Sequence, residues 1–526
     1  MVTAPMSLPN CAGSLAWRWC RGHGMYLTFD IGTTSIKVAL FDPEGRLAAK
    51  AIRDCVLQTP DINWYEADPE LYWRAVVEGS REVLSRSGIA PREVKTVSGC
   101  SQGETVIFLD GEGRPTRPAM VWLDLRAREE ARELSGLATL DELYTLTGQT
   151  DFDPTWSACK VLWVKKHQPE VFAKTRRLLL VEDYIVWRLS GRACSSPNLL
   201  SSSLFVDVRS RRYWNRFVDY LGLAPLLPEI IESGEVVGPI SGAAAAEMGL
   251  LPGTLIVKGA MDQATSAIGA GNIEPGIVTE TTGSVMAIGI TSRTADPAPT
   301  VRLPYQPHLV REAYLYLPYV QTAGSAYKWW RDKFCQEEIA HAGGLEAAYA
   351  EMNALAASAP PGSEGLVFLP FLAGAGQPEN DPDARGVLYG LTLKHDRGHC
   401  ARAIMESIAF LLRKILEDFR RSGVVMQELR SMGGGARSEL WLQIKADVTG
   451  LPLVRMEEEE TATLGAAILA AVACGDFPDL SSATAAMVRL GRRFEPDPAA
   501  AAVYERSFSL YDELYRALVP LFRKYS

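Results

Sequence analysis

The chain has 526 residues, a length typical of two large or three ordinary domains. Its hydrophobic fraction of 47%, charged fraction of 22% and net charge of −9 are those of a globular protein without a broad basic surface, so we expect no nucleic-acid partner. No stretch of about 18 apolar residues is free enough of charge to cross a bilayer, so we expect no membrane partner. The nine cysteines form no CxxC pair, which favours a cytoplasmic protein in a reducing compartment.

Residues 1–24 differ in composition from the rest of the chain. They mix Pro, Ser and Gly with Trp17, Trp19 and basic residues, and they form neither a secretory signal nor a clear amphipathic transit helix. Because Met25 directly precedes the first expected strand, we interpret residues 1–24 as a disordered extension or as the product of an upstream start codon.

The first expected elements are strands. Residues 26–30 are apolar enough for a buried strand, residues 36–41 alternate like a second, and residues 47–52 can return as a third after a Pro-Glu-Gly turn. The pattern predicts an antiparallel meander with a tight Gly-Thr-Thr-Ser turn between its first two strands. A helical pattern follows at residues 69–87.

The arrangement recurs in the second half of the chain. Residues 277–280 and 285–288 predict another hairpin with hydroxyl residues and a glycine at its bend, and residues 401–421 carry apolar side chains at helical spacing. Alternating strand and helix units indicate an α/β fold, and the repetition suggests two related lobes. We place the lobes at residues 25–270 and 271–526, with a small-residue boundary near 269–272.

One carboxylate stands out, in Gly259-Ala260-Met261-Asp262-Gln263-Ala264. Held in a nearly uncharged turn, Asp262 could take a proton from a substrate hydroxyl. An Asp in such a turn is also a common helix N-cap or Asx-turn residue, and this alternative stays open.

Other segments favour phosphoryl transfer, which needs backbone donors around phosphates and a carboxylate for Mg²⁺. Asp30-Ile31-Gly32-Thr33-Thr34 and Glu280-Thr281-Thr282-Gly283-Ser284 are two turns that could present N–H groups and hydroxyls to phosphates, with Asp30 serving the metal. The consecutive glycines of Gly433-Gly434-Gly435-Ala436 could let a flat adenine lie against the backbone, although such a loop can also serve close packing alone. No Walker loop is present.

From Tyr26 to about Gly475 these ordered motifs resemble the FGGY carbohydrate kinases. The resemblance implies two actin-like, ribonuclease-H-like lobes with an interlobe cleft: an N-terminal sugar-binding lobe and a C-terminal nucleotide-binding lobe. It implies ATP and Mg²⁺ as cofactors, Asp262 as the catalytic base, and Asp30 as the metal residue. The nucleotide-side residues that it implies are Gly32, Thr33, Thr34, Thr282, Gly283, Gly324, Gly434, Gly435 and Ala436.

The sugar-side segments depart from the xylulokinase pattern. Ser101-Gln102-Gly103-Glu104-Thr105 is closer to the Gln-Arg-Glu-Thr of glycerol kinases but lacks their Arg, and Ser195-Ser196-Pro197-Asn198 stands where many relatives have Thr-Asp. Charged side chains here could bind hydroxyls, although each could also be a surface residue. The expected substrate-binding residues are Gln102, Glu104, Trp122, Asp124, Arg126 and Asp262.

We therefore expect ATP-dependent phosphorylation of a primary hydroxyl of a small sugar or polyol, with a ketopentose as the first choice and a xylulokinase-like activity. A glycerol-like or tetritol-like polyol is the second choice. An actin-like ATPase or chaperone is the alternative from another class. The sequence leaves the oligomeric state open, and a homodimer is one possibility.

Overall fold

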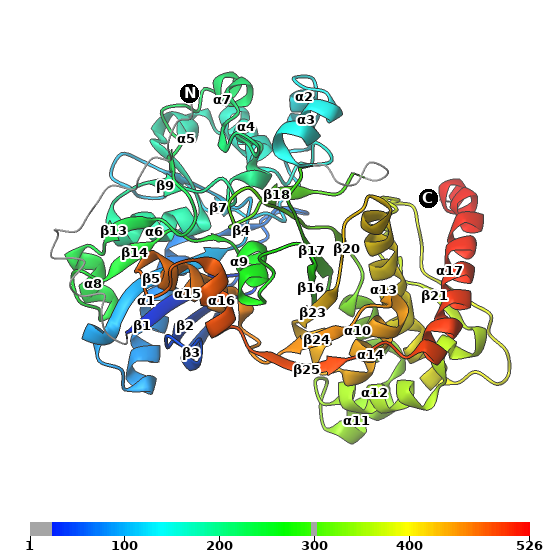
Figure 1. Ribbon diagram of the computed structural model, residues 1–526. Helices are drawn as coiled ribbons and strands as arrows, with labels where there is room; N and C mark the ends of the chain where they lie inside the picture. Colours follow the sequence, from blue (N-terminus) through cyan, green and yellow to red (C-terminus); the bar gives the residue numbers. More distant parts are fainter. Residues whose placement is uncertain (1–23, 296–301, 526) are drawn as a thin grey trace, which may run out of the picture. The chain divides into compact units, whose positions relative to one another are not determined.

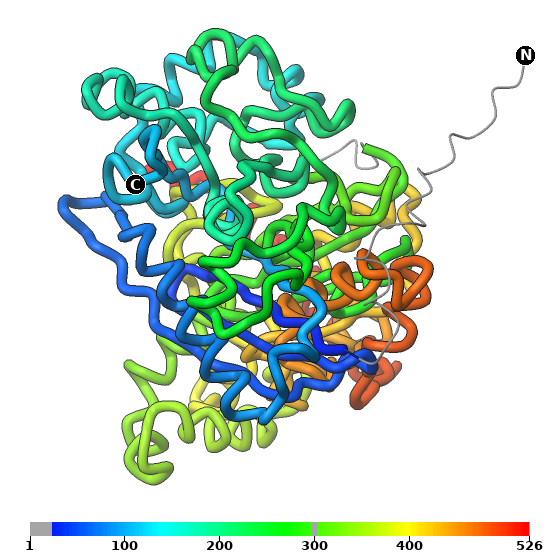
Figure 2. Tube along the Cα trace, turned by 90° about the vertical axis from the view of Figure 1, so that its left-hand side faces the viewer, coloured from blue at the N-terminus to red at the C-terminus, as the bar shows by residue number. Residues whose placement is uncertain are grey.

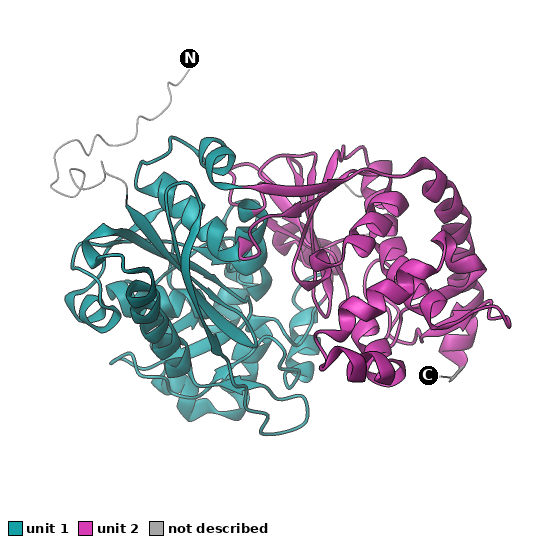
Figure 3. Ribbon diagram, turned by 90° about the horizontal axis from the view of Figure 1, so that it is seen from below, with its two compact units in different colours: residues 1–139, 152–269, 462–488 teal, residues 140–151, 270–461, 489–526 magenta. Residues whose placement is uncertain are grey.

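The computed structural model describes residues 24–295 and 302–525, so the expectation for residues 1–23 lies outside the described residues. The chain forms two compact units (Figure 3). The first comprises Phe152–Gly269 and Ala462–Val488 together with the described residues up to Thr139. The second comprises Leu140–Asp151, Ala270–Thr461 and Arg489–Ser526, as far as these are described.

A seven-stranded sheet forms the core of the first unit (Figure 1). Its order is β13 (Val236–Pro239), β14 (Leu255–Val257), β5 (Val94–Ser101), β1 (Met25–Ile31), β2 (Ser35–Phe41) and β3 (Leu47–Asp54), and β15 (Ala260–Met261) also pairs with β5. The pairs β1–β2 and β2–β3 are antiparallel, which confirms the predicted meander. Strand β1 is buried along its whole length because it lies between β2 and the parallel β5.

Helix α1 (Pro69–Ser87) has the predicted bounds because its ends are coded locally. The Asp68 side chain accepts a hydrogen bond from the Glu70 amide at the N-terminus, and Gly88 takes the left-handed conformation at the C-terminus. A second sheet holds β4 (Glu66–Ala67), β7 (Ala119–Met120), β6 (Val106–Leu109) and β8 (Arg177–Leu180). The other helices and strands of this unit are α2 (Arg128–Ser135), α4 (Ser157–His167), α5 (Pro169–Lys174), α6 (Val181–Ser190), β9 (Cys194–Ser195), β10 (Val206–Asp207), β11 (Arg212–Tyr213), α7 (Asn215–Leu221), β12 (Glu229–Ile230), α8 (Gly242–Met248) and α9 (Asp262–Gly269).

The segment Ala462–Val488 returns to the first unit from late in the chain, so the lobes at 25–270 and 271–526 need a correction. It contains most of α15 (Thr461–Ala473) and all of α16 (Leu480–Met487), which lie beside the first strands in both views (Figures 1 and 2). Gly465 packs so closely on α9 that a Cβ there would lie 1.9 Å from the Thr265 carbonyl oxygen. Asp476 accepts hydrogen bonds from the Tyr26 hydroxyl at 2.6 Å and from Lys95 Nζ at 2.8 Å.

The second unit is built on an eight-stranded sheet. Its order is β18 (Tyr305–Pro307), β19 (Tyr314–Tyr316), β17 (Met286–Ser292), β16 (Ile277–Thr282), β23 (Glu428–Met432), β24 (Leu453–Met456) and β25 (Leu490–Phe494), with β20 (Tyr319–Val320) paired to β17. The hairpin β16–β17 lies next to the parallel β23, as β1–β2 lies next to β5. The repetition seen in the sequence therefore corresponds to a repeated sheet arrangement.

The helices of this unit include α13 (Arg397–Arg421), which begins at Arg397 and not at 401 because the Asp396 side chain caps the His399 amide. Helix α14 (Glu439–Thr449) begins after Ser438 and ends before Gly450, as predicted. The remaining helices and strands are α3 (Leu140–Thr147), α10 (Gly324–Phe334), α11 (Gln336–Ala342), α12 (Ala348–Ser358), β21 (Val367–Leu369), β22 (Val387–Tyr389) and α17 (Pro498–Tyr525). None of the helices in the described part of the chain combines the length and hydrophobicity needed to span a bilayer.

Candidate active site

Three neighbouring parallel strands of the first unit end at one edge of its sheet. In the register of β1, β5 and β15, Asp30 lies opposite Cys100, and Met261 lies opposite Ser101. The next residues along the chain therefore bring Gln102 and Asp262 to the same edge as Asp30. This is the edge where ligands bind in open α/β sheets.

The surroundings of Asp262 make it a weak acid. Burial, followed by the negative charge of Asp30, raises the pKa of Asp262 to about 8, while a hydrogen bond from the Gln263 amide to Oδ1, at 2.6 Å, opposes the rise. Asp262 is also the first residue of α9, so the same side chain can serve at the start of a helix and carry a reactive carboxyl group. A carboxyl group with a pKa near the working pH is well matched to accept a proton from a hydroxyl.

The turn between β1 and β2 is tied to the candidate sugar loops. The Trp122 indole N–H donates to Thr33 Oγ1 at 2.7 Å, and the Thr33 hydroxyl donates to Gln102 Oε1 at 2.9 Å. Gly32 closes the turn with its amide on the Ser35 carbonyl, and Thr34 is exposed. Trp122 as a residue is 36% exposed, so part of this large apolar residue remains accessible beside these polar groups.

Glu104 projects from the loop after β5 in a left-handed conformation, with φ of 53°. Its carbonyl oxygen accepts hydrogen bonds from Ser157 Oγ at 3.0 Å and from Lys160 Nζ at 3.2 Å, which fixes the loop on α4. Burial raises the pKa of the Glu104 carboxyl above its ordinary value, and burial lowers the pKa of Lys160 to about 8. Glu104 thus presents a half-buried carboxyl group whose backbone is held rigidly.

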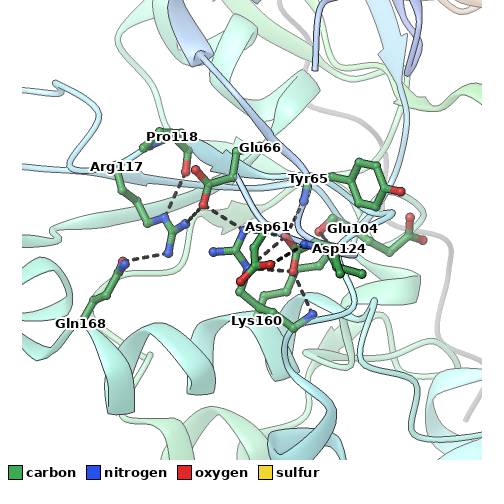
Figure 4. A network of polar contacts seen from close by, with 11 residues as sticks. Asp61, Tyr65, Glu66, Glu104, Arg117, Pro118, Asp124, Lys160 and Gln168 are labelled. Carbon is green, nitrogen blue, oxygen red and sulfur yellow. Dashed lines mark hydrogen bonds and ion pairs between the residues drawn. The ribbon is translucent and has the colours of Figure 1, made fainter. Parts of the chain in front are cut away.

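Asp124 lies in a network of polar contacts with other protein groups (Figure 4), and Arg126 is paired with Asp124. Asp124 is fully buried and accepts hydrogen bonds from the Tyr65 amide at 2.8 Å and from Arg126. Arg126 also pairs with Glu66 at 2.9 Å and lies 3.8 Å above the centre of the Trp64 ring. This geometry favours a supporting role for Asp124 and Arg126 in the loop that carries Trp122, and their direct contact with a substrate stays a prediction.

The nucleotide-side residues of the second unit gather around the β16–β17 turn. The amide of Gly324, the first residue of α10, donates to the Gly283 carbonyl at 3.0 Å, and the Ser325 amide donates to the Ser284 carbonyl. A Cβ at position 324 would lie 2.2 Å from the Gly283 oxygen, so this close approach requires glycine. Gly283 itself is exposed on the turn.

Thr282 differs from the expected phosphate ligand. Its side chain is buried, its hydroxyl donates to Glu280 Oε2 at 2.7 Å, and Lys445 Nζ donates to it at 2.9 Å. Lys445 and Glu280 form a fully buried ion pair at 2.7 Å beneath the turn. Gly435 packs on Thr282, where a Cβ would lie 2.6 Å from the Thr282 Cβ, while Gly434 is exposed and Ala436 is buried. The glycine loop therefore serves close packing and also leaves an exposed backbone surface.

Two sets of residues that support the Asp262 loop carry no recognisable signal in the sequence. Lys258 is fully buried between Glu182 and Asp183, and Glu182 also accepts the Gly259 amide at 2.9 Å. The Asn198 side chain accepts the Met261 amide at 3.0 Å. These partners are more than 60 residues from the loop, and only the folded chain brings them together.

Carboxylates at the ends of parallel strands in the first unit, and glycine-rich turns in the second unit, are the kinds of group that phosphoryl transfer to a hydroxyl requires. Residues 25–269 match the N-terminal domain, and residues 277–474 the C-terminal domain, of the FGGY family of carbohydrate kinases. The chain belongs to this family and is an ATP-dependent carbohydrate kinase.

Individual relatives are similar over nearly their whole length. The chain is 27% identical over 496 residues to a xylulose kinase of Staphylococcus epidermidis, covering 93% of this chain and 96% of that protein. The solved xylulose kinase from Rhodospirillum rubrum has a TM-score of 0.86 at 30% identity and covers 95% of this chain and 100% of that chain. The solved gluconate kinase from Lactobacillus acidophilus has a TM-score of 0.87 at 25% identity, and the match covers 96% of this chain and 100% of that chain. The predicted α/β fold with two actin-like domains is confirmed.

Proposed function

We propose that the protein transfers the γ-phosphoryl group of ATP to a primary hydroxyl of a ketopentose such as xylulose. The observation that carries the proposal is that Asp262, Asp30 and Gln102 lie at one edge of the first sheet, where the pKa of Asp262 is raised to about 8. The names of the similar xylulose kinases support the substrate class.

In this mechanism Asp262 accepts the proton of the acceptor hydroxyl as the oxygen bonds to the γ-phosphorus and the bond to ADP breaks. The products are ADP, a sugar phosphate and a proton. Glu104 accepts a hydrogen bond from a second hydroxyl, and the accessible part of Trp122 packs on the carbon chain. Within the first unit the turn at residues 32–34 offers donors suited to phosphate oxygens, and within the second unit the exposed turn at Gly283 offers donors of the same kind.

Asp30 fits a magnesium site. Its carboxylate is largely buried at the end of β1, 3.9 Å from Lys37 Nζ, and Mg²⁺ commonly uses one or two carboxylates together with substrate phosphates. When bound, Mg²⁺ neutralises charge on the phosphates.

The charges of the acceptor side favour a neutral substrate over an acid sugar. A substrate carboxylate would meet the Asp262 and Glu104 carboxyls, which already repel each other. The nearby cations are engaged: Lys37 with Asp30, Lys160 with the Glu104 carbonyl, and Arg126 with Asp124 and Glu66. A small polyol is the second candidate, because Gln102-Gly103-Glu104-Thr105 resembles the glycerol kinase loop.

A steady-state panel tests the proposal. ADP formation is measured with xylulose, ribulose, erythritol, glycerol and gluconate at equal concentrations, with Asp262→Asn as the matched control. We expect the highest kcat/KM for a ketopentose and the lowest for gluconate. A preference for gluconate would contradict the charge argument, and no activity on any neutral sugar or polyol would contradict the function.

The described cysteines are consistent with the cytosol, which we propose as the compartment. Each of them is free and buried. Structural disulfides are typical of oxidising compartments, and free thiols are typical of reducing ones.

A further inference from the structure

The loop at residues 195–203 contacts the segment that carries Glu104 and the segment that carries Asp262. It starts in β9, contains the short helix η3 (Ser201–Ser203), and is buried throughout. Its beginning, Ser195-Ser196-Pro197-Asn198, is where the sequence departs from many relatives. The reaction described above assigns no step to this loop.

Asn198 contacts the backbone that presents the catalytic base. Its Oδ1 accepts the Met261 amide at 3.0 Å, and Met261 is the residue directly before Asp262. Asn198 is 1% exposed and Met261 is also buried, so this bond is shielded from solvent. Loss of the acceptor would leave the amide unpaired one residue from Asp262.

Ser202 differs from the two serines beside it. Ser201 Oγ donates to the Asn198 carbonyl at 2.7 Å, and Ser203 Oγ donates to the Leu200 carbonyl at 2.6 Å. Ser202 Oγ has no partner that meets hydrogen-bond geometry among the described residues, although its side chain is buried. An unpaired buried hydroxyl is costly and requires an explanation.

The surroundings of Ser202 provide one. A Cβ on Gly103 would lie 3.1 Å from Ser202 Oγ, so the loop lies against the segment that carries Glu104, and the Asn198–Met261 hydrogen bond joins the loop to the segment that carries Asp262. The Ser202 side chain also interacts with the Glu104 carboxyl and lowers its pKa. Burial is the largest influence on the Glu104 carboxyl and raises its pKa. Ser202 and, to a smaller extent, Lys160 oppose this rise, whereas the charge of Asp153 adds to it. Asp262 also interacts electrostatically with Glu104.

We propose that residues 195–203 form a positioning loop, in which Asn198 fixes the backbone that presents Asp262 and Ser202 orients Glu104 toward the acceptor. The inference rests on the proposed function and adds Asn198 and Ser202 as positioning residues. Because Ser202 Oγ is buried, it acts through Glu104 and not by contact with the sugar.

The test compares three variants of the full-length protein. Asn198→Leu keeps the volume and removes the acceptor, Ser202→Ala removes the unpaired hydroxyl, and Ser203→Ala is the matched control because its hydroxyl bonds only to nearby backbone groups in the described structure. We expect Asn198→Leu to lower kcat at least about tenfold with little change in either KM, since small displacements of a catalytic group are costly. We expect Ser202→Ala to raise the acceptor KM about fivefold to tenfold, most strongly at low pH.

A second measurement, hydrogen exchange, does not depend on catalytic activity. Hydrogen exchange of the peptide that contains Met261 should become at least tenfold faster in Asn198→Leu and stay unchanged in Ser203→Ala. Unchanged exchange together with unchanged kcat would overturn the role of Asn198, and an unchanged acceptor KM and pH profile in Ser202→Ala would overturn that of Ser202. If the wild-type protein phosphorylates no acceptor, the proposed function fails, and the exchange result still decides whether Asn198 holds the loop.

Discussion

The substitution Asp262→Asn isolates the proton acceptor from the rest of the site. The Asp262 Oδ1 atom accepts the Gln263 amide at 2.6 Å, and an Asn side chain has an oxygen that can keep this bond. The first turn of α9 and the volume of the side chain are then retained. What is lost is the ability to take a proton from the acceptor hydroxyl.

A positioned general base contributes about 10²- to 10⁴-fold, so kcat should fall by that factor, equivalent to about 3 to 5 kcal/mol of barrier. The pKa of about 8 adds a second signature. The ionised carboxylate is the active form, so wild-type activity is lost as the pH falls through 8. At pH 7 about one tenth of Asp262 is ionised, and kcat/KM for the acceptor should rise about fivefold between pH 7 and 8.

The assay is coupled ADP release from pH 6 to 9 at saturating ATP and Mg²⁺, with the coupling enzymes in excess at every pH. Melting curves of both proteins serve as the folding control. The reasoning is refuted if the folded variant keeps kcat within about threefold of wild type, or if its pH profile retains the wild-type acid limb.

Asp30→Ala should raise the Mg²⁺ concentration needed for half-maximal rate and leave Mg²⁺-free nucleotide binding nearly unchanged; a rate titration against Mg²⁺ that matches wild type would contradict the metal role. Glu104→Ala should lower kcat/KM on the true substrate at least about tenfold and narrow the gap to an analogue lacking the contacted hydroxyl, so an unchanged ranking of acceptors would argue against it. Gly324→Ala should lower the melting temperature and raise the KM for ATP, because its Cβ would lie 2.2 Å from the Gly283 oxygen. Gly344→Ala is the control, since a Cβ there meets nothing within 4 Å, and equal melting of the two variants would contradict the packing argument.

The features that the sequence predicted are coded by neighbouring residues. The meander β1–β3 follows from alternating apolar residues and turn residues, and α1 follows from Asp68 and Gly88 at its ends. Asp30 was predicted to end its strand and Asp262 to lie in a turn, but their meeting at one edge depends on the pairing of β1, β5 and β15. Local chemistry was sufficient for the meander and for α1, and not for this placement.

Other features depend on contacts that no local pattern encodes. Glu182 and Lys258 meet across 76 residues of sequence, and their charges alone predict two exposed side chains. In the sequence Thr282 is a candidate phosphate ligand, but in the structure its hydroxyl is already hydrogen-bonded to Glu280 and Lys445. The return of Ala462–Val488 to the first unit is equally a property of the tertiary structure.

The central claim is that the γ-phosphoryl group goes to a carbon-bound hydroxyl of a sugar. The most direct measurement is phosphorus and proton NMR of the products formed from ATP and xylulose by the purified protein. The account predicts ADP and a phosphomonoester whose phosphorus couples to the protons of the terminal CH₂ group, with little inorganic phosphate. ADP and inorganic phosphate in equal amounts, with the sugar unchanged for every ketose and polyol tried, would contradict it and favour an actin-like ATPase.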